Sequence, residues 1–213
     1  MEQFELSSRA FGSAVSKAVE VLRVGGVILY PTDTLYGLGA DAFSDEAVDT
    51  VYEIKGRDEK KPIHCIVADI EMAERYAAVS NDARLLFERL TPGALTLIVK
   101  KRPDVKGGIA RGLDTIGIRI PKSDFCLALA REFGRPFTTT SANLAGLAPA
   151  RPVDGILQQL GRAAEGIDLV VDAGELPPSE ASTVVDLSGE EPAILREGAV
   201  PVADVWNTIR ICQ

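Results

Sequence analysis

The stretch that most constrains the fold is an apolar run that stops at a proline. Val27–Tyr30 has the composition of a buried β-strand, and Pro31 ends it because proline cannot donate to a strand ladder. Thr32–Thr34 follow, and then Gly37 and Gly39. Ligands of open α/β sheets bind just beyond strand ends, where glycines let the backbone approach them closely. The stretch therefore predicts either a ligand-binding loop or a turn that simply ends a strand.

Strand-like and helix-like segments alternate along the rest of the chain. Amphipathic patterns predict helices at residues 8–24, 44–56, 69–77, 81–90, 123–133, 153–160 and 202–210. Apolar runs predict strands at residues 27–30, 63–67, 95–99, 116–120, 137–140, 169–171, 184–187 and 193–195. Because some neighbouring strands have no helix between them, we expect an α/β fold with a mixed sheet. No linker or repeat divides the chain, which predicts a single domain over residues 1–213.

Histidine and cysteine are too sparse for most metal or redox sites. The chain has one histidine, His64, and three cysteines, Cys65, Cys126 and Cys212, without a C-x-x-C pair. Neither a disulfide framework nor a zinc site is indicated. His64 lies in a predicted strand, where we expect it to be packed or hydrogen-bonded.

The bulk composition indicates a soluble cytoplasmic protein. Apolar residues make up 46% of the chain, but no apolar run reaches the roughly 18–20 residues that span a bilayer. The first residues lack the basic-then-apolar order of a signal peptide. The net charge of −8 argues against broad binding to polyanions but leaves room for a local basic pocket.

Cations, hydroxyls and amides recur at the ends of the predicted strands and helices. In an acidic chain this recurrence points to an anionic ligand, because Arg forms a fork that fits phosphate or carboxylate and Lys supplies a point charge. The candidates are Lys55, Arg57, Lys60 and Lys61; Thr115 and Arg119; Thr138, Thr139, Thr140, Ser141 and Asn143; and Ser182, Thr183 and Arg196.

Each candidate also has an ordinary structural explanation. Residues 55–61 are typical of a solvated helix end, and residues 141–143 of a helix N-cap. Arg196 could pair with Glu197 at the surface. Arg119 is less ordinary, because it lies in an apolar strand and needs a partner or a ligand there.

Taken together, these pieces resemble the YrdC-like family of threonylcarbamoyl-AMP synthases, which act in tRNA t6A modification. The matching motifs are YPTDTLYGLG, KGR followed by KKP, TPGALTLIV, GIRIP, SAN, STVVDLS and LREGA. They run from about residue 10 to residue 200, and the chain resembles the short form without an extra C-terminal domain. The resemblance implies a single YrdC-like domain, in which a twisted mixed parallel and antiparallel sheet with helices packed around it carries a concave basic cavity.

The resemblance also implies roles for individual positions. The catalytic set at the ATP phosphates would be Lys55, Arg57, Ser141 and Asn143, and the nucleotide would further contact Lys61, Thr115 and Arg196. L-Threonine would be held by Thr34, Arg119, Thr139 and Ser182, with Arg119 on its carboxylate. Some relatives place a threonine-contacting histidine at the position of Ile66, so His64 on the same strand face is a further candidate. No protein metal site is expected.

The implied reaction converts L-threonine, bicarbonate or CO2, and ATP into L-threonylcarbamoyladenylate and pyrophosphate for tRNA t6A37. It needs no protein nucleophile, and Mg²⁺ is expected on the polyphosphate of ATP. The product would pass to the tRNA threonylcarbamoyl-transferase complex, and a contact with tRNA is left open.

Other functions are also considered. A double-stranded RNA-binding module on the same fold is the main alternative, although the net charge of −8 favours the enzyme. A carbamoyl-adenylating domain of hydrogenase maturation normally lies inside a much longer chain. Residues 37–42 match the dinucleotide pattern G-x-G-x-x-A, but they come too late after the strand, and a Walker-type phosphate loop is absent.

Overall fold

The computed structural model describes residues 1–58 and 61–210, so Lys60 and Cys212 lie outside the described residues. The strands are β1 (Glu2–Glu5), β2 (Ile28–Pro31), β3 (Tyr36–Gly39), β4 (His64–Ile66), β5 (Leu95–Lys100), β6 (Thr115–Arg119), β7 (Phe137–Ser141), β8 (Leu169–Asp172), β9 (Thr183–Asp186) and β10 (Ala193–Arg196). The helices are α1 (Phe11–Arg23), α2 (Asp45–Lys55), α3 (Ile70–Tyr76), α4 (Asn81–Leu90), α5 (Asp124–Phe133), α6 (Val153–Leu160) and α7 (Val202–Arg210), with short 3-10 turns η1 (Gly108–Ala110) and η2 (Gly161–Gly166).

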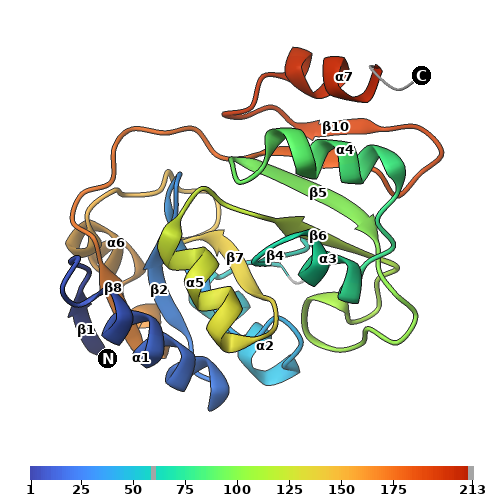
Figure 1. Cartoon of the computed structure of the whole chain (residues 1–213). Coiled ribbons are helices and arrows are strands. Elements are labelled where there is room, and N and C mark those ends of the chain that lie inside the picture. Colours follow the sequence, from blue (N-terminus) through green and yellow to red (C-terminus); the bar gives the residue numbers. More distant parts are fainter. Residues whose placement is uncertain (59–60, 211–213) are drawn as a thin grey trace.

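Within the described residues, the strands form one ten-stranded sheet in the order β1-β8-β2-β3-β7-β4-β6-β5-β9-β10. β7 lies near the middle and joins the half that contains β2 and β8 to the half that contains β4, β6 and β5 (Figure 1). The sheet is mixed, because β4 runs parallel to β6 but antiparallel to β7. The predicted α/β class is confirmed, and the single-domain assignment stays a prediction.

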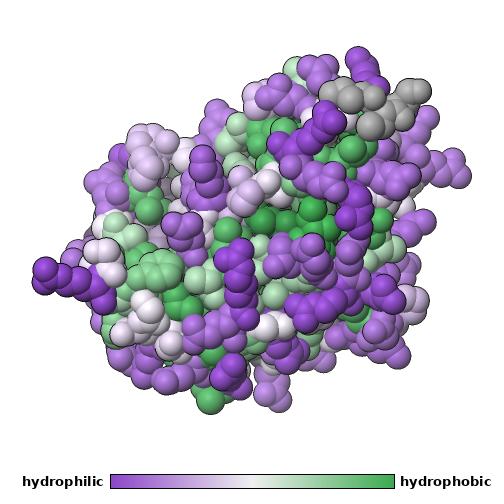
Figure 2. All heavy atoms as spheres, viewed as in Figure 1, coloured by the Kyte–Doolittle hydropathy of each residue, from purple (hydrophilic) through white to green (hydrophobic). Residues whose placement is uncertain are grey.

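The helices bury their apolar stripes against the sheet or against each other. α1 and α5 pack side by side, and α7 packs on α4, which covers β5 (Figure 1). The buried residues of α1 recur at the expected helical spacing: Ala14, Val15, Ala18, Val19 and Leu22. Hydrophilic residues cover much of the outer face, with hydrophobic ones showing between them (Figure 2). None of the described helices is both long and apolar enough to cross a membrane.

The segment after Pro31 contains the expected polar turn and also a strand that the sequence pattern did not predict. Residues 36–39 form β3, which pairs antiparallel with β2 across a turn at residues 32–35. The turn is held by the Thr32 hydroxyl, which accepts the N–H of Thr34 at 3.0 Å and of Leu35 at 3.1 Å. A Cβ at Gly39 would lie 2.8 Å from the ring of Tyr30, so this glycine makes room for a buried tyrosine and not for a ligand.

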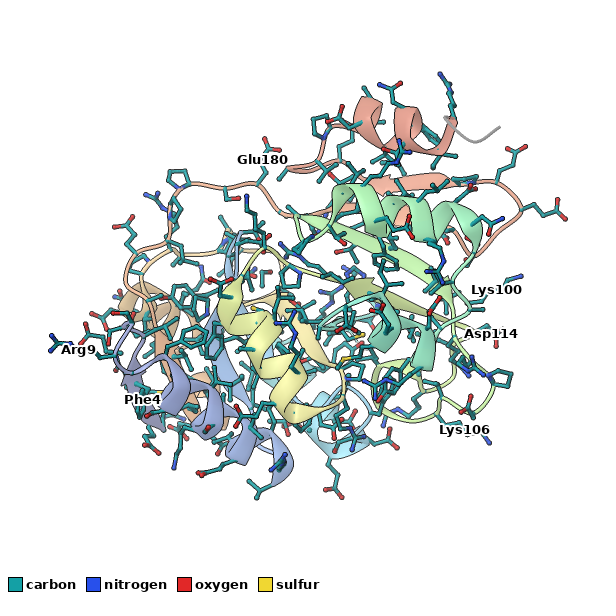
Figure 3. All side chains as sticks on the ribbon, in the orientation of Figure 1. Phe4, Arg9, Lys100, Lys106, Asp114 and Glu180 are labelled. Carbon is teal, nitrogen blue, oxygen red and sulfur yellow. The ribbon has the colours of Figure 1, made fainter. Side chains whose placement is uncertain are left out.

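The glycine-rich loop at residues 101–114 is anchored to the start of α2. The Gly108 N–H donates to the Asp45 carboxylate, and the Ile109 N–H donates to the Ala42 carbonyl at 2.9 Å. Gly108 has a φ of 49°, and a Cβ there would overlap the backbone of residues 42–43. The side chains of Lys106 and Asp114, at two points of this loop, point outward from the protein (Figure 3). The loop is therefore held against the start of α2.

Candidate active site

A polar cavity of about 130 Å³ lies where the two halves of the sheet meet. It is walled by the turn between β2 and β3, the residues after α2, and parts of β4, β5, β6, β7 and β10 with the approach to β9. Its lining residues are Thr32, Thr34, Leu35, Tyr36, Gly37, Arg57, Pro62, Ile63, His64, Thr96, Arg119, Thr139, Thr140, Ser141, Ala181, Ser182 and Arg196. Glu180 points outward from the segment that brings Ala181 and Ser182 to the cavity (Figure 3).

Arg119 is buried at the end of β6 and has the partner that the sequence required. Its Nη2 lies 2.6 Å from Asp33 Oδ1, and its Nη1 donates to Thr34 Oγ1 at 3.1 Å. Both partners come from the turn between β2 and β3. The Nε atom is buried and has no hydrogen-bond partner among the described residues. The guanidinium thus keeps donor capacity beside the cavity while the protein holds its other edge.

Arg196 reaches the cavity rim from the edge strand β10. Its Nε and Nη2 donate to the Ser182 carbonyl at 3.0 and 2.7 Å, and Nη2 also donates to Ser182 Oγ at 3.1 Å. Ser182 Oγ in turn lies 2.9 Å from Thr96 Oγ1. Partial burial, followed by the charges of Arg119 and Arg57, lowers the pKa of Arg196. Arg196 therefore contacts Ser182, which immediately precedes the neighbouring strand β9, and not Glu197.

Arg57 follows the left-handed Gly56 that ends α2, where φ is 54°. Its Nη2 donates to the Pro62 carbonyl at 3.2 Å. Its Nε is buried without a hydrogen-bond partner among the described residues. Arg57 therefore lines the cavity with one terminal nitrogen held by the backbone, and its Nε, like that of Arg119, is unpaired among the described residues.

Lys55 points inward from the last turn of α2 and does not line the cavity. Its Nζ donates to the carbonyls of Ser141 and Asn143, the latter at 3.0 Å, and lies 3.4 Å from Asn143 Oδ1. These contacts occupy the three donors of an ammonium group. Only 3% of the residue is exposed, and burial, with the Arg57 charge, lowers the pKa of Lys55 to about 8. Lys55 clamps the backbone after β7.

Residues 141–143 form that clamped turn and do not cap a helix. Ser141 Oγ donates to Asn143 Oδ1, and Asn143 Nδ2 donates to the carbonyls of Leu144 at 2.9 Å and Leu147 at 2.7 Å. Ser141 lines the cavity, whereas Asn143 lies behind it. The lysine and the amide thus build the turn that presents the serine.

His64 lies on β4, opposite Thr139 of β7, with its ring over Gly117 of β6. A Cβ at Gly117 would come within 2.8 Å of His64 Cγ. Burial, followed by the charges of Arg196, Arg57 and Arg119, lowers the pKa of His64 to about 4. At neutral pH the ring is uncharged and can both donate and accept one hydrogen bond.

Some candidates lie outside the cavity wall. Lys61 is exposed, and Thr115 pairs with Lys100 at the far end of β6, although it is on the same strand face as Arg119. The candidates that do line the cavity are Thr34, Arg57, His64, Arg119, Thr139, Thr140, Ser141, Ser182 and Arg196. Thr96 also lines the cavity but was not predicted, because its only local signal in the sequence is a hydroxyl within an apolar strand.

The cavity combines cations with hydroxyls. No residue of its described lining carries a carboxylate, and the described residues contain no cluster of three or more His, Cys, Asp or Glu arranged for a metal ion. Arginine forks and oriented hydroxyls suit an anionic ligand, and they can offset charge that develops during its reaction.

Comparisons with known proteins find related sequences and related structures. The Sua5/YciO/YrdC family model, described as "Telomere recombination", matches residues 20–198. A Methanocaldococcus jannaschii protein named putative threonylcarbamoyl-AMP synthase is 36% identical over 84% of this chain and 82% of its own. The Bacillus subtilis threonylcarbamoyl-AMP synthase is 36% identical over 87% of this chain and 54% of its own, so this chain spans about half the length of that relative.

A solved structure also has the same fold as this chain. The crystal structure of Pyrococcus abyssi Sua5 complexed with L-threonine superposes with a TM-score of 0.87 at 30% identity, covering 98% of this chain and 60% of that one. Because the family match spans most of the sequence and the fold agrees over nearly all of it, the chain belongs to the Sua5/YciO/YrdC family.

Proposed function

We propose that this chain is an L-threonylcarbamoyladenylate synthase for tRNA t6A37 modification. It would convert L-threonine, bicarbonate or CO2, and ATP into L-threonylcarbamoyladenylate and pyrophosphate. The observation that carries the proposal is the convergence of Arg57, Arg119 and Arg196 on one hydroxyl-lined cavity in a chain of net charge −8. The names of the relatives support it.

The amino acid would occupy the deeper part of this cavity. Arg119 would bind its carboxylate, and Thr34, Thr139 and Ser182 would orient its polar groups. Neutral His64, across the strand pair from Thr139, would contribute one further hydrogen bond.

The polyphosphate of ATP would lie near Arg57, Ser141 and Arg196. In this proposal Lys55 and Asn143 belong to the catalytic set by fixing Ser141, because their polar groups already bind the turn. Lys61 and Thr115 would contact parts of the nucleotide that extend beyond the cavity wall.

The chemistry requires no protein nucleophile. The threonine amine attacks CO2 and loses a proton, which gives a carbamate. A carbamate oxygen then attacks the α-phosphorus of ATP, and the bond to pyrophosphate breaks. The arginines would hold two anions together and stabilise the charge on the departing pyrophosphate.

Mg²⁺ is proposed to arrive with ATP. Because no carboxylate occurs in the described lining, the ion would be held by phosphate oxygens and water. Transfer of the product to the tRNA threonylcarbamoyl-transferase complex, contact with tRNA and a cytoplasmic location are further parts of the proposal.

The test is pyrophosphate release that depends on ATP, threonine and bicarbonate. We expect Arg57→Ala to lower the rate roughly 10²–10³-fold, as loss of an electrostatic contact to a transition state typically does. Lys55→Ala should also lower the rate, because it releases the turn that presents Ser141. Arg84→Ala is the control, because Arg84 of α4 pairs with Glu74 of α3 on the protein surface, away from the cavity. Calorimetry with threonine, serine and alanine, with and without ATP, tests the substrate.

Absence of adenylate formation by the wild-type protein would refute the proposal. Tight double-stranded RNA binding with a steep salt dependence, together with no threonine binding, would support the RNA-binding alternative instead.

A further inference from the structure

Asp33 is a largely buried carboxylate that contacts Arg119, a residue of the cavity wall, from outside the cavity. Its side chain is 12% exposed, and Asp33 is not among the lining residues. One oxygen, Oδ1, accepts from Arg119 Nη2 at 2.6 Å, and the other, Oδ2, accepts the Lys122 N–H at 3.0 Å. Asp33 therefore ties the turn between β2 and β3 to the end of β6.

These contacts fix the orientation of Arg119. Asp33 and the adjacent Thr34 each hold one terminal nitrogen, so the planar guanidinium cannot rotate without breaking both bonds. The buried Nε is left without a partner among the described residues. An uncompensated buried donor of this kind is expensive unless an anion completes it.

Repulsion makes this fixation necessary. Arg119 lines the cavity together with Arg57 and Arg196, so three positive charges lie near one another and repel each other. Without the negative charge of Asp33, this repulsion would favour a position of the Arg119 guanidinium farther from Arg57 and Arg196. The Asp33 carboxylate is the acidic partner that the structure gives Arg119.

We infer that Asp33 is the positioning residue of the amino-acid site: it aims Arg119 at the substrate carboxylate without touching the substrate itself. The inference rests on the proposed function. It distinguishes Asp33 from the residues that contact ATP, because its bonds reach Arg119 and the backbone of Lys122 and none reaches Arg57 or Ser141.

The test compares Asp33→Asn with Asp41→Asn by calorimetry on the full chain. Asp41 is a matched control, since its side chain is also 12% exposed, pairs with Arg135 at 3.2 Å and accepts the Phe43 N–H. We expect Asp33→Asn to weaken threonine binding about tenfold or more, as loss of a charged hydrogen-bond partner does, and to leave ATP binding within about twofold. Asp41→Asn should bind both as the wild type does.

A double-mutant cycle separates positioning from a structural role. In an Arg119→Met background, Asp33→Asn should add little further loss of threonine binding, because the guanidinium that Asp33 holds has gone. Additive losses, or equal losses for threonine and ATP, would overturn the inference.

Two further outcomes are informative. If Asp33→Asn does not fold, Asp33→Glu carries the test, because a carboxylate displaced by one methylene should weaken threonine binding alone. Wild-type affinity in either variant refutes the inference, whereas a wild-type protein that binds no threonine refutes the proposed function itself.

Discussion

The imidazole of His64 on β4 lies directly over Gly117 on β6, the strand that runs parallel beside β4. A side chain at Gly117 would overlap the ring, so the imidazole can pack against the backbone here only because residue 117 is a glycine. The two residues lie on the face of the sheet that carries Arg119. The position of His64 in the cavity thus depends on a residue that has no side chain.

Gly117→Ala should displace His64 and weaken threonine binding. Overpacking of this kind costs about 1–3 kcal/mol, which thermal or chemical unfolding would measure. The control is Gly12→Ala in α1, where an added Cβ has no neighbour within 4 Å and should be neutral or slightly stabilising. Equal behaviour of the two variants would contradict the packing described.

His64 should titrate near pH 4, well below an ordinary histidine. It is the one histidine of the sequence, so its imidazole signals in an NMR titration are unambiguous. A midpoint near pH 6.5 would show that the ring is neither buried nor surrounded by arginines.

The same shift makes stability depend on pH. Between about pH 4 and 6.5 the unfolded chain binds a proton at His64 that the folded chain does not. The free energy of unfolding of the wild type should therefore fall, relative to that of His64→Gln, as the pH is lowered through this window. Parallel pH profiles from denaturant unfolding would contradict the assignment.

Lys55→Met should loosen the turn after β7. The carbonyls of Ser141 and Asn143 lose their shared donor, so backbone amides at residues 141–147 should exchange faster with deuterium. Lys101→Met is the control, because Lys101 also donates to a carbonyl, that of Val105 at 2.9 Å, but away from the cavity. Unchanged exchange in Lys55→Met would show that the clamp is not needed.

Cys65 and Cys126 should resist thiol reagents in the folded protein. Both are buried, and burial raises the pKa of each thiol to about 12, so little reactive thiolate forms. In a Cys212→Ser background these are the remaining thiols of the chain. Reaction should begin only in denaturant; rapid labelling of the native protein would contradict the burial of both residues.

The alternation of apolar strands with amphipathic helices was sufficient to predict the mixed α/β fold, because burial imposes a local period on each element. The sequence pattern did not predict strands β1 and β3. Glu2–Glu5 is largely polar, and Tyr36–Gly39 contains two glycines, which carry no side-chain pattern. β1 becomes a strand by pairing with the distant β8, and β3 by pairing with the adjacent β2 and the distant β7.

The sequence by itself also determined which groups could bind an anion, since arginines and hydroxyls at strand ends are visible residue by residue. Only the tertiary structure decided their roles. It turned Lys55 inward to the backbone after β7, set Asp33 behind Arg119 and left Thr115 far along β6. The reason is physical: the direction of a side chain and its hydrogen-bond partners depend on strand pairing between distant segments, which no local pattern records.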